Sequence, residues 1–279
     1  MAFYADTLGL SDSAFTLLRD LIHERTGLFY ENGKSDLLTD KLAPLVIERG
    51  FSSFLDYYYL LKYDAGAEQE WRRVMDSLSV QETYFWREMD QIRALVDVIA
   101  PQHFAARPAQ SLRIWSAACA TGEEPLSIAM ALNEEGWFDR APIEIYASDA
   151  SPSALEKARR GIYRERSFRS LPEKLREKYF SEERGASRVA PGLHSRIKWA
   201  TANLMNEGDV ATYATASVIF CRNVFIYFSD DTIRKTVRLF AERMPEPGYL
   251  FVAASESLLR LTTQLRFQEI GGAFVYVKG

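Results

Sequence analysis

The sequence has very few cysteines and histidines. Only two cysteines, Cys119 and Cys221, occur among its 279 residues, and they cannot build a disulfide framework. A reducing compartment, and with it a cytoplasmic location, is therefore expected. The three histidines, His23, His103 and His194, are far apart in sequence, and no His/Cys spacing resembles a zinc site. No bound metal is expected.

Long apolar runs and an excess of positive charge are also missing. No stretch of about 18 apolar residues occurs, so no membrane insertion is expected. The N-terminal segment MAFYADTLGLSDS has no positive n-region and no long apolar h-region, so it does not read as a signal peptide. The chain has 34 Lys and Arg against 38 Asp and Glu, a net charge of −4. A mildly acidic chain is a poor general nucleic-acid binder, because neutralising phosphates requires clustered cations.

The chain does have enough apolar residues for a globular core, 47% of the total, and its length suits two domains. Its charge is unevenly divided. Residues 1–78 contain 8 Lys and Arg against 13 Asp and Glu, a net charge of −5, which leaves +1 for the rest. This division coincides with a change in the apolar pattern and indicates two different parts.

The first hundred residues read as helices. Apolar side chains recur at helical spacing in four segments. The first begins at a possible N-cap, Ser11 or Ser13, and ends at Gly27, and the second includes Leu37 and closes at Gly50. A longer helix is expected over residues 88–104. We therefore expect an all-α N-terminal recognition domain over residues 1–88, with a linker helix to about residue 108.

After Pro108 the pattern alternates between strands and helices. Helices are expected at about 125–136, 153–163 and 230–243, and strands at 112–116, 143–149, 196–204, 217–221 and 248–255. Residues 266–279 form two strand-like runs around Gly271–Gly272, which is a hairpin signal. This alternation predicts an α/β fold with a doubly wound parallel sheet and antiparallel strands at one edge.

The loop after the first strand carries the clearest chemical signal. Every residue from 116 to 122 is small, which lets the backbone approach a ligand closely. Glu123 and Glu124 follow, with no Lys or Arg, and both the GxGxxG and the GxxxxGK[ST] patterns are absent here. A cationic or amino-bearing ligand therefore fits this loop better than a phosphate. The alternative is that both glutamates only interact favourably with the helix dipole.

The second strand ends in Asp149, whose carboxylate can accept hydrogen bonds from two ribose hydroxyls. Its alternative role is as the N-cap of a helix that starts near Ser153. Together with the acidic loop, Asp149 favours a nucleoside ligand that has a positive charge and no phosphate. S-adenosylmethionine fits that description.

Five segments make the chain resemble the chemotaxis receptor methyltransferases, the CheR family. They are QETYFWRE (81–88), RIWSAACATGEEPLSIAM (113–130), IYASDASPSALEKARRGIY (145–163), ANLM (202–205) and VIFCRNVFIYF (218–228). The resemblance implies a Rossmann-like class I methyltransferase domain over residues 109–279, with a small β-subdomain inserted at about 164–202. It also implies S-adenosylmethionine-dependent transfer of methyl to glutamate γ-carboxylates of methyl-accepting chemotaxis receptors, giving methyl esters and S-adenosylhomocysteine.

The resemblance also assigns site residues. Tyr227 matches a family tyrosine beside the transferring methyl, and Arg87 and Tyr227 are the expected catalytic residues, which position the acceptor carboxylate. The alternative for Arg87 is that it holds the carboxylate of the cofactor. The cofactor contacts that it implies are Gln81 (where the family usually has Asn), Thr83, Arg87, Glu124, Asp149, Asn203, Leu204, Arg222 and Asn223. A glutamate acceptor has a pKa of about 4.3, so it is already ionised near neutral pH and needs no general base.

The sequence departs from the family in two regions that are expected to contact the receptor. The family's receptor-binding helix has a basic face, whereas here Lys34, Lys41 and Arg49 are offset by acidic neighbours. The insert is compact, which predicts that no receptor C-terminal pentapeptide is needed. A monomer is expected. Two alternatives stay open: a non-catalytic S-adenosylmethionine-binding sensor or interaction module, and a methyltransferase with a different acceptor.

Overall fold

The computed structural model describes residues 8–279, which its contacts divide into two compact units. The first unit comprises the described residues up to Val80 together with Tyr227–Ser229, and the second comprises Gln81–Ile226 and Asp230–Gly279. The first seven residues of the segment considered as a signal peptide lie outside the described range. The domain limits expected from the sequence stay predictions.

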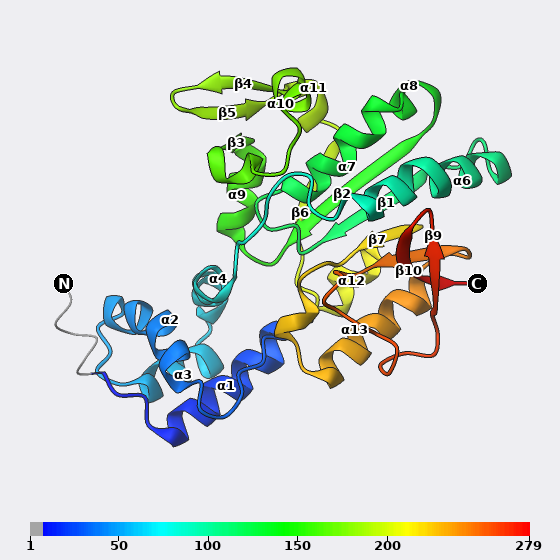
Figure 1. Ribbon diagram of the computed structural model, residues 1–279. Coiled ribbons are helices and arrows are strands. Elements are labelled where there is room, and N and C mark those ends of the chain that lie inside the picture. The colour runs from blue at the N-terminus through cyan, green and yellow to red at the C-terminus, as the bar shows by residue number, and fades with distance from the viewer. Residues whose placement is uncertain (1–7) are drawn as a thin grey trace. The chain divides into compact units, whose positions relative to one another are not determined.

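The first unit is helical, as the apolar spacing predicts (Figure 1). Its helices are α1 (Asp12–Thr26), α2 (Ser35–Glu48), α3 (Phe54–Tyr63) and α4 (Ala67–Leu78). Ser11 caps α1 by accepting a hydrogen bond from the Ala14 amide, and Gly27 ends that helix in the left-handed region. Buried side chains from all four helices, including Leu18, Leu42, Phe54 and Trp71, form one core. Leu37 is an exception to the expected second stripe, because it is 48% exposed.

A short segment from late in the chain also belongs to the first unit. The 3-10 helix η4 (Phe225–Tyr227) ends here, and the main-chain oxygen of Tyr227 accepts a 2.8 Å hydrogen bond from the Phe29 amide. Leu28 forms an isolated antiparallel bridge with Phe228. Leu28 and Phe29, which follow α1, therefore bond the main chain of Tyr227 and Phe228.

A continuous helical stretch lies near the start of the second unit, after residues 81–88. It consists of α5 (Met89–Arg93), the π-helical segment η2 (Ala94–Ile99) and α6 (Ala100–Ala106). This confirms the long helix expected near residues 88–104. Its apolar face, which includes Ile92 and Leu95, joins the core of the sheet.

Seven strands form the central sheet of the second unit, in the order β6-β2-β1-β7-β8-β10-β9 (Figure 1). Every pairing from β6 across to β8 is parallel, and β10 is antiparallel to both β8 and β9. The hairpin expected at Gly271–Gly272 thus closes one edge, and the predicted fold class is confirmed. The strands are β1 (Leu112–Ala117), β2 (Ile143–Asp149), β6 (Ile197–Thr201), β7 (Val218–Phe220), β8 (Gly248–Phe251), β9 (Arg266–Ile270) and β10 (Ala273–Lys278).

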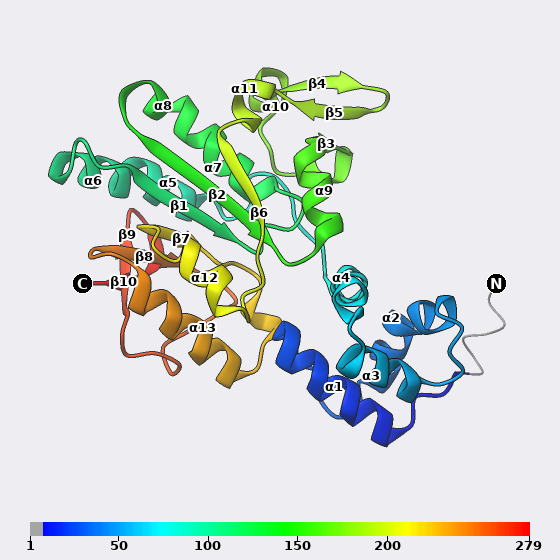
Figure 2. The ribbon, with the colours of Figure 1, turned by 180° about the vertical axis from the view of Figure 1, so that it is seen from behind.

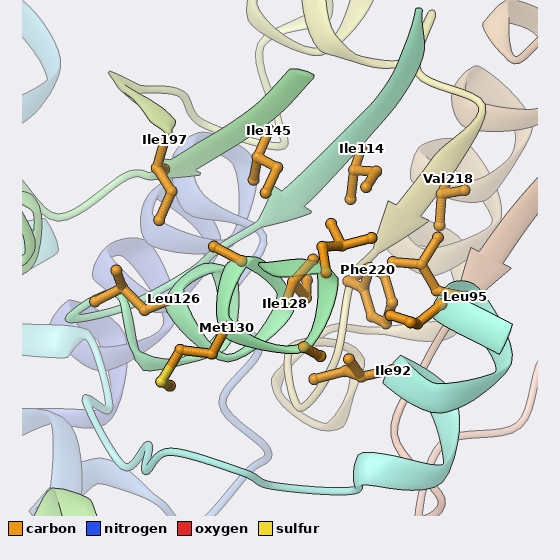
Figure 3. Close-up of a cluster of buried hydrophobic side chains, with 14 of the residues drawn as sticks. Ile92, Leu95, Ile114, Leu126, Ile128, Met130, Ile145, Ile197, Val218 and Phe220 are labelled. Atoms are coloured by element: carbon orange, nitrogen blue, oxygen red, sulfur yellow. The ribbon is translucent and has the colours of Figure 1, made fainter. Parts of the chain in front are cut away.

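Helices cover both faces of this sheet because successive strand residues point to opposite sides. Ile114 joins the core that includes α7, and Figure 3 shows it pointing toward that helix together with Ile145 and Ile197 of the neighbouring strands. The next residue, Trp115, packs against Phe240 and Tyr213 from the opposite face. Figure 2 shows the helices that carry these two rings, α12 and α13. The helices are α7 (Glu123–Glu134), α8 (Trp137–Arg140), α9 (Pro152–Arg160), α12 (Glu207–Tyr213) and α13 (Asp230–Arg243).

A three-stranded antiparallel sheet, in the order β3-β5-β4, lies within the sequence between α9 and β6 (Figure 1). Helix α9 ends at Arg160 rather than at the predicted residue 163, because Gly161 is left-handed and the chain then enters β3. The inserted elements are β3 (Ile162–Tyr163), η3 (Glu165–Phe168), α10 (Glu173–Tyr179), β4 (Phe180–Glu183), β5 (Ala186–Val189) and α11 (Pro191–His194).

Candidate functional site

The loop between β1 and α7 has an unusual backbone. Ala118, Ala120 and Gly122 all have positive φ angles, of 55°, 49° and 94°. A Cβ on Gly122 would lie 2.8 Å from the Trp199 ring and 3.0 Å from Ala158, so this position admits only glycine without a shift of its neighbours. The small side chains noted in the sequence therefore permit a tightly turned loop at the carboxyl end of the sheet.

Asp149, at the end of β2, uses both carboxylate oxygens to hold this region together. Oδ2 accepts a 2.8 Å hydrogen bond from the Ala120 amide, and Oδ1 accepts one of 2.8 Å from the Ser151 amide. The helix that follows is capped by Ser151, whose hydroxyl accepts from the Ala154 amide. The alternative role of Asp149 as that N-cap is thus wrong, and its carboxylate instead joins the two loops that end β1 and β2.

Glu124 and Arg222 form a buried ion pair. The Glu124 carboxylate accepts 2.6 Å hydrogen bonds from the Ser116 hydroxyl and from Nε of Arg222. The side chains are only 12% and 2% exposed. Nη1 of Arg222 donates to the Glu88 carbonyl at 3.3 Å, and Nη2 donates to the Arg87 carbonyl at 3.1 Å. Two residues expected as separate cofactor contacts are therefore bound to each other, and Arg222 also holds the main chain at Arg87 and Glu88.

Glu123 is also turned into the protein. Its carboxylate accepts hydrogen bonds from the hydroxyls of Thr121, at 2.7 Å, and Ser167, at 2.9 Å. Burial raises the pKa of Glu123, and these two hydrogen bonds offset that effect only in part. Since Ser167 belongs to η3, Glu123 fastens the inserted subdomain to the loop after β1.

The segment that begins with Gln81 is tied to α9. The Gln81 side chain accepts a 2.8 Å hydrogen bond from Nζ of Lys157 and donates one of 3.4 Å to the Ser153 hydroxyl. The half-buried Thr83 follows, and its hydroxyl makes no hydrogen bond within residues 8–279. The longer Gln, where the family usually has Asn, is thus accommodated by contacts with the first turns of α9.

Arg87 is a half-buried cation at the end of this segment. Its Nη1 donates a 3.3 Å hydrogen bond to the Glu82 carbonyl, and its guanidinium lies 5.4 Å from the centre of the Tyr84 ring. It forms no ion pair with a carboxylate of the described chain. A half-buried guanidinium without a carboxylate partner is suited to bind a carboxylate from elsewhere.

The remaining predicted contacts follow β6 and β7. The Asn203 amide donates a 3.0 Å hydrogen bond to Asp209, its side-chain oxygen accepts from the Met205 amide, and Leu204 is buried. Asn223 is left-handed, with φ of 59°, and its amide donates to Glu256 at 3.0 Å. Its side-chain amide makes no hydrogen bond among the described residues, which leaves both donor and acceptor available.

Tyr227 is the one predicted site residue that belongs to the first unit. The rest belong to the second unit, where the carboxyl ends of β1, β2, β6 and β7 bear or adjoin them. That is the edge at which open α/β sheets bind ligands. The roles of the individual residues in binding or catalysis stay predictions.

Two polar side chains in this region were not anticipated from the sequence. Gln91 accepts a hydrogen bond from Nη1 of Arg222 and donates one of 2.8 Å to the Val252 carbonyl. Glu256 accepts from the amides of the loop after β7. Glu256 follows β8, and a polar residue just beyond a strand end is a sequence signal for a site residue. Gln91 lies within a helix, and the sequence has no such signal for it.

The polar groups at this edge suit a nucleoside that has a carboxylate and no phosphate. Asp149 and the side-chain amide of Asn223 can bond hydroxyl and amino groups, and Arg87 can bind a carboxylate. The loop from Ala117 to Gly122 contains no cation for a phosphate. Within residues 8–279, no group of three or more His, Cys, Asp and Glu residues could hold a metal ion. No helix among these residues has the length and apolar character needed to cross a membrane.

Comparison with known proteins identifies both units. Residues 81–273 match the family model described as CheR methyltransferase, SAM binding domain, and residues 13–79 match CheR methyltransferase, all-alpha domain. Chemotaxis protein methyltransferase 2 of Vibrio cholerae is 35% identical over 276 residues, covering 97% of this chain and 95% of that protein. The chemotaxis protein methyltransferase of Escherichia coli is 32% identical over 260 residues, covering 92% and 88%. That of Klebsiella aerogenes is 31% identical over 278 residues, covering 98% and 93%.

Proposed function

The chain belongs to the CheR family of chemotaxis protein methyltransferases, and from that premise we propose how its residues carry out the reaction. The chain is a protein-glutamate O-methyltransferase that uses S-adenosylmethionine to methylate chemoreceptors. S-adenosylmethionine supplies a methyl group on a positively charged sulfur. The protein must therefore bind this cofactor and present an acceptor carboxylate to its methyl group.

The observation that best supports this proposal is the pairing of Asp149 with the loop after β1. Its carboxylate accepts hydrogen bonds from the amides of Ala120 and Ser151, and a carboxylate oxygen can accept more than one hydrogen bond. The neighbouring loop has three left-handed residues and no cation. We propose that Asp149 accepts hydrogen bonds from ribose hydroxyls, while Thr83, Asn203, Leu204 and Asn223 contact the rest of the cofactor.

Arg87 is proposed to bind a carboxylate at the site. An acceptor glutamate is already ionised near neutral pH, so the reaction needs orientation rather than proton removal. The half-buried guanidinium of Arg87, which has no carboxylate partner in the described chain, is suited to that orientation. The carboxylate of the cofactor is the other candidate, and the effect of Arg87→Ala on cofactor affinity separates the two. Tyr227 is proposed, from its match to the family, as the second catalytic residue.

Arg222 and Glu124 are proposed to act on the site indirectly. Arg222 directs its donors to Glu124, Gln91 and the carbonyls of Arg87 and Glu88. A guanidinium that is bonded in this way has few N–H donors available for a ligand. We propose that the ion pair positions the main chain that carries Arg87.

We propose that the inserted subdomain does not bind a receptor C-terminal pentapeptide. The β4–β5 connection is only the left-handed pair Arg184–Gly185, so the subdomain has no long loop there. This supports methylation that is independent of a receptor C-terminal pentapeptide, and micromolar binding of such a peptide would overturn it. We also propose a cytoplasmic monomer, which light scattering of the purified protein and cell fractionation would test.

The deciding experiment is a transfer assay with methyl-labelled S-adenosylmethionine and membranes that contain candidate chemoreceptors. Label on a receptor that base treatment releases supports a glutamate methyl ester. Arg87→Ala is expected to abolish this label, whereas Arg260→Ala, at an exposed arginine of the same unit, is expected to retain it. Base-stable label would indicate a different acceptor. Cofactor binding without transfer to any receptor would indicate a non-catalytic sensor.

A further inference from the structure

The loop that follows β7 has little regular structure to hold it. It runs from Arg222 through the left-handed Asn223 to the short helix η4. A left-handed conformation is uncommon for any residue with a Cβ, although Asn tolerates it better than most. Main-chain amides in such a loop need partners from outside it.

One carboxylate supplies those partners. Oε2 of Glu256 accepts hydrogen bonds from the amides of Asn223, at 3.0 Å, and Ala253, at 2.8 Å. Oε1 accepts from the amide of Ile226 at 3.2 Å, and the Phe225 main chain hydrogen-bonds the same carboxylate. Glu256 is only 9% exposed. Both oxygens are therefore engaged, and they span the loop from Asn223 to Ile226.

Glu256 is itself held firmly. Its amide donates a 2.8 Å hydrogen bond to the Ala253 carbonyl, and the nearby Leu258 amide donates one of 2.7 Å to the Tyr276 hydroxyl. The segment before it is fixed by Gln91, which bonds the Val252 carbonyl. The carboxylate is thus presented to the loop from a rigid support.

We infer that Glu256 is a positioning residue for methyl transfer. Its carboxylate shapes the Asn223–Ile226 loop so that the side-chain amide of Asn223 points toward the cofactor. The inference rests on the proposed function, because it takes Asn223 as a cofactor contact. Glu256 itself touches neither the cofactor nor the acceptor.

The geometry requires a carboxylate in particular. Each oxygen of Glu256 accepts from main-chain N–H groups, whereas a glutamine side chain has only one acceptor oxygen. In either orientation of a glutamine at this position, its NH₂ group would face amide donors. Glu256→Gln therefore preserves volume and burial while leaving part of the loop without acceptors.

The test compares Glu256→Gln with Glu269→Gln, which makes the same change at an exposed glutamate on β9. Calorimetry measures the Kd of S-adenosylhomocysteine, and the transfer assay measures kcat and the KM for receptor. For Glu256→Gln we expect at least about tenfold weaker binding and a similar fall in kcat, with KM within about twofold. Glu269→Gln is expected to match the wild type. A folded Glu256→Gln protein that binds and turns over like the wild type overturns the inference.

Two further variants test whether Glu256 acts through Asn223 and cover the case in which Glu256→Gln does not fold. If Glu256 acts through Asn223, Glu256→Gln should weaken cofactor binding no further in an Asn223→Ala background, and additive losses would contradict this. If Glu256→Gln does not fold, Glu256→Asp, which retains both oxygens on a shorter stem, is expected to bind more weakly than wild type, and unchanged affinity would overturn the inference. Absence of binding to the wild-type protein would instead refute the proposed function.

Discussion

Each unit of the molecule has a buried glutamate that pairs with arginine. The two clusters differ in whether they bond only side chains or also the main chain of a loop. In the helical unit, Glu70 accepts hydrogen bonds from the side chains of Tyr57, at 2.8 Å, and Arg49, and Arg73 lies 3.4 Å away. In the second unit, Glu124 pairs with Arg222, whose remaining donors include bonds to the Arg87 and Glu88 carbonyls. The first cluster joins side chains on helices, whereas the second reaches the backbone of a loop.

The two clusters also differ in the other interactions that stabilise the segments around them. Helices α2, α3 and α4 already satisfy their own backbones and share a large apolar core, so the Glu70 cluster adds stability to a structure that packing defines. Residues 81–88 are neither helix nor strand, and Arg222 holds the main chain of the last two of them, Arg87 and Glu88. We expect changes in the first cluster to alter stability only, and changes in the second to alter binding and catalysis as well.

The largest effect is expected from Arg222→Met. Removing one member of a buried pair leaves Glu124 uncompensated, so the free energy of unfolding should fall by about 3–5 kcal/mol. Because the Arg87 segment loses its anchor, kcat of the folded protein should fall by about 100-fold. Urea unfolding and the transfer assay, performed well below the melting temperature, measure the two effects.

The double variant Arg222→Met, Glu124→Met distinguishes the effect of an unpaired charge on stability from the effect of lost main-chain bonds on transfer. With both charges gone, much of the stability should return, because the uncompensated carboxylate is removed. Transfer should stay low, because the bonds to the Arg87 and Glu88 carbonyls are still absent. Recovery of transfer along with stability would contradict the positioning role of Arg222.

A second comparison uses glycines in the two units. Gly122→Ala places a Cβ 2.8 Å from the Trp199 ring on a backbone with φ of 94°. We expect the loop after β1 to shift and S-adenosylhomocysteine binding to weaken by about tenfold or more, given the roughly 1–3 kcal/mol that such strained positions cost. Calorimetry gives the affinity.

Gly50→Ala is its control in the helical unit. Its φ is 75°, so the left-handed penalty is similar, but nothing lies within 4 Å of the added Cβ. Stability should fall by about 1 kcal/mol without a change in affinity. Equal loss of affinity in both variants would show that backbone strain, rather than the loop's shape, limits binding.

Glu70→Gln should reduce stability while leaving transfer unchanged. Burial tends to raise the pKa of Glu70, but hydrogen bonds from Arg49 and Tyr57 and the charge of Arg73 outweigh it and lower the pKa. Its stabilisation is therefore present above the unfolded pKa of about 4.3 and is lost as the pH falls through the lower folded pKa. We expect the variant to be less stable by about 1–3 kcal/mol at pH 7. Urea unfolding should show that difference shrinking in acid.

The smallest effect, with the opposite sign, is expected from Glu123→Gln. Burial raises the pKa of Glu123, so the folded state binds more protons than the unfolded state between the two pKa values. The wild type should therefore lose stability as the pH rises through that interval. The glutamine variant should equal or slightly exceed the wild type at pH 7, by less than about 1 kcal/mol in urea unfolding. A large loss at pH 7 would mean that the charged carboxylate stabilises the fold.

Much of the fold was predictable because its signals are local. Strand β2 and helix α13 occupy the predicted ranges 143–149 and 230–243, since each combines an apolar pattern with polar residues at its ends. Gly27 ends α1 as expected. Leu37 was misplaced because helical spacing alone does not say where the core boundary falls.

The site was predictable as a set of residue types and less so as a set of contacts. Glu124 and Arg222 are 98 residues apart, and only the sheet order brings β1 beside β7 and lets them meet. Asp149 bonds Ala120 across neighbouring strand ends for the same reason. The position of Glu256 after β8 was a signal, but its contacts were not predictable, because the amides that it accepts from belong to a loop whose shape the sequence does not specify.

The most direct measurement is calorimetric titration of S-adenosylhomocysteine into Arg222→Met and Glu70→Gln, each confirmed as folded at the temperature used. We predict that Arg222→Met binds at least about tenfold more weakly than the wild type, while Glu70→Gln binds within about twofold of it. Equal losses in both variants, or an unchanged affinity in Arg222→Met, would contradict the claim that the buried charges of the second unit shape the cofactor site.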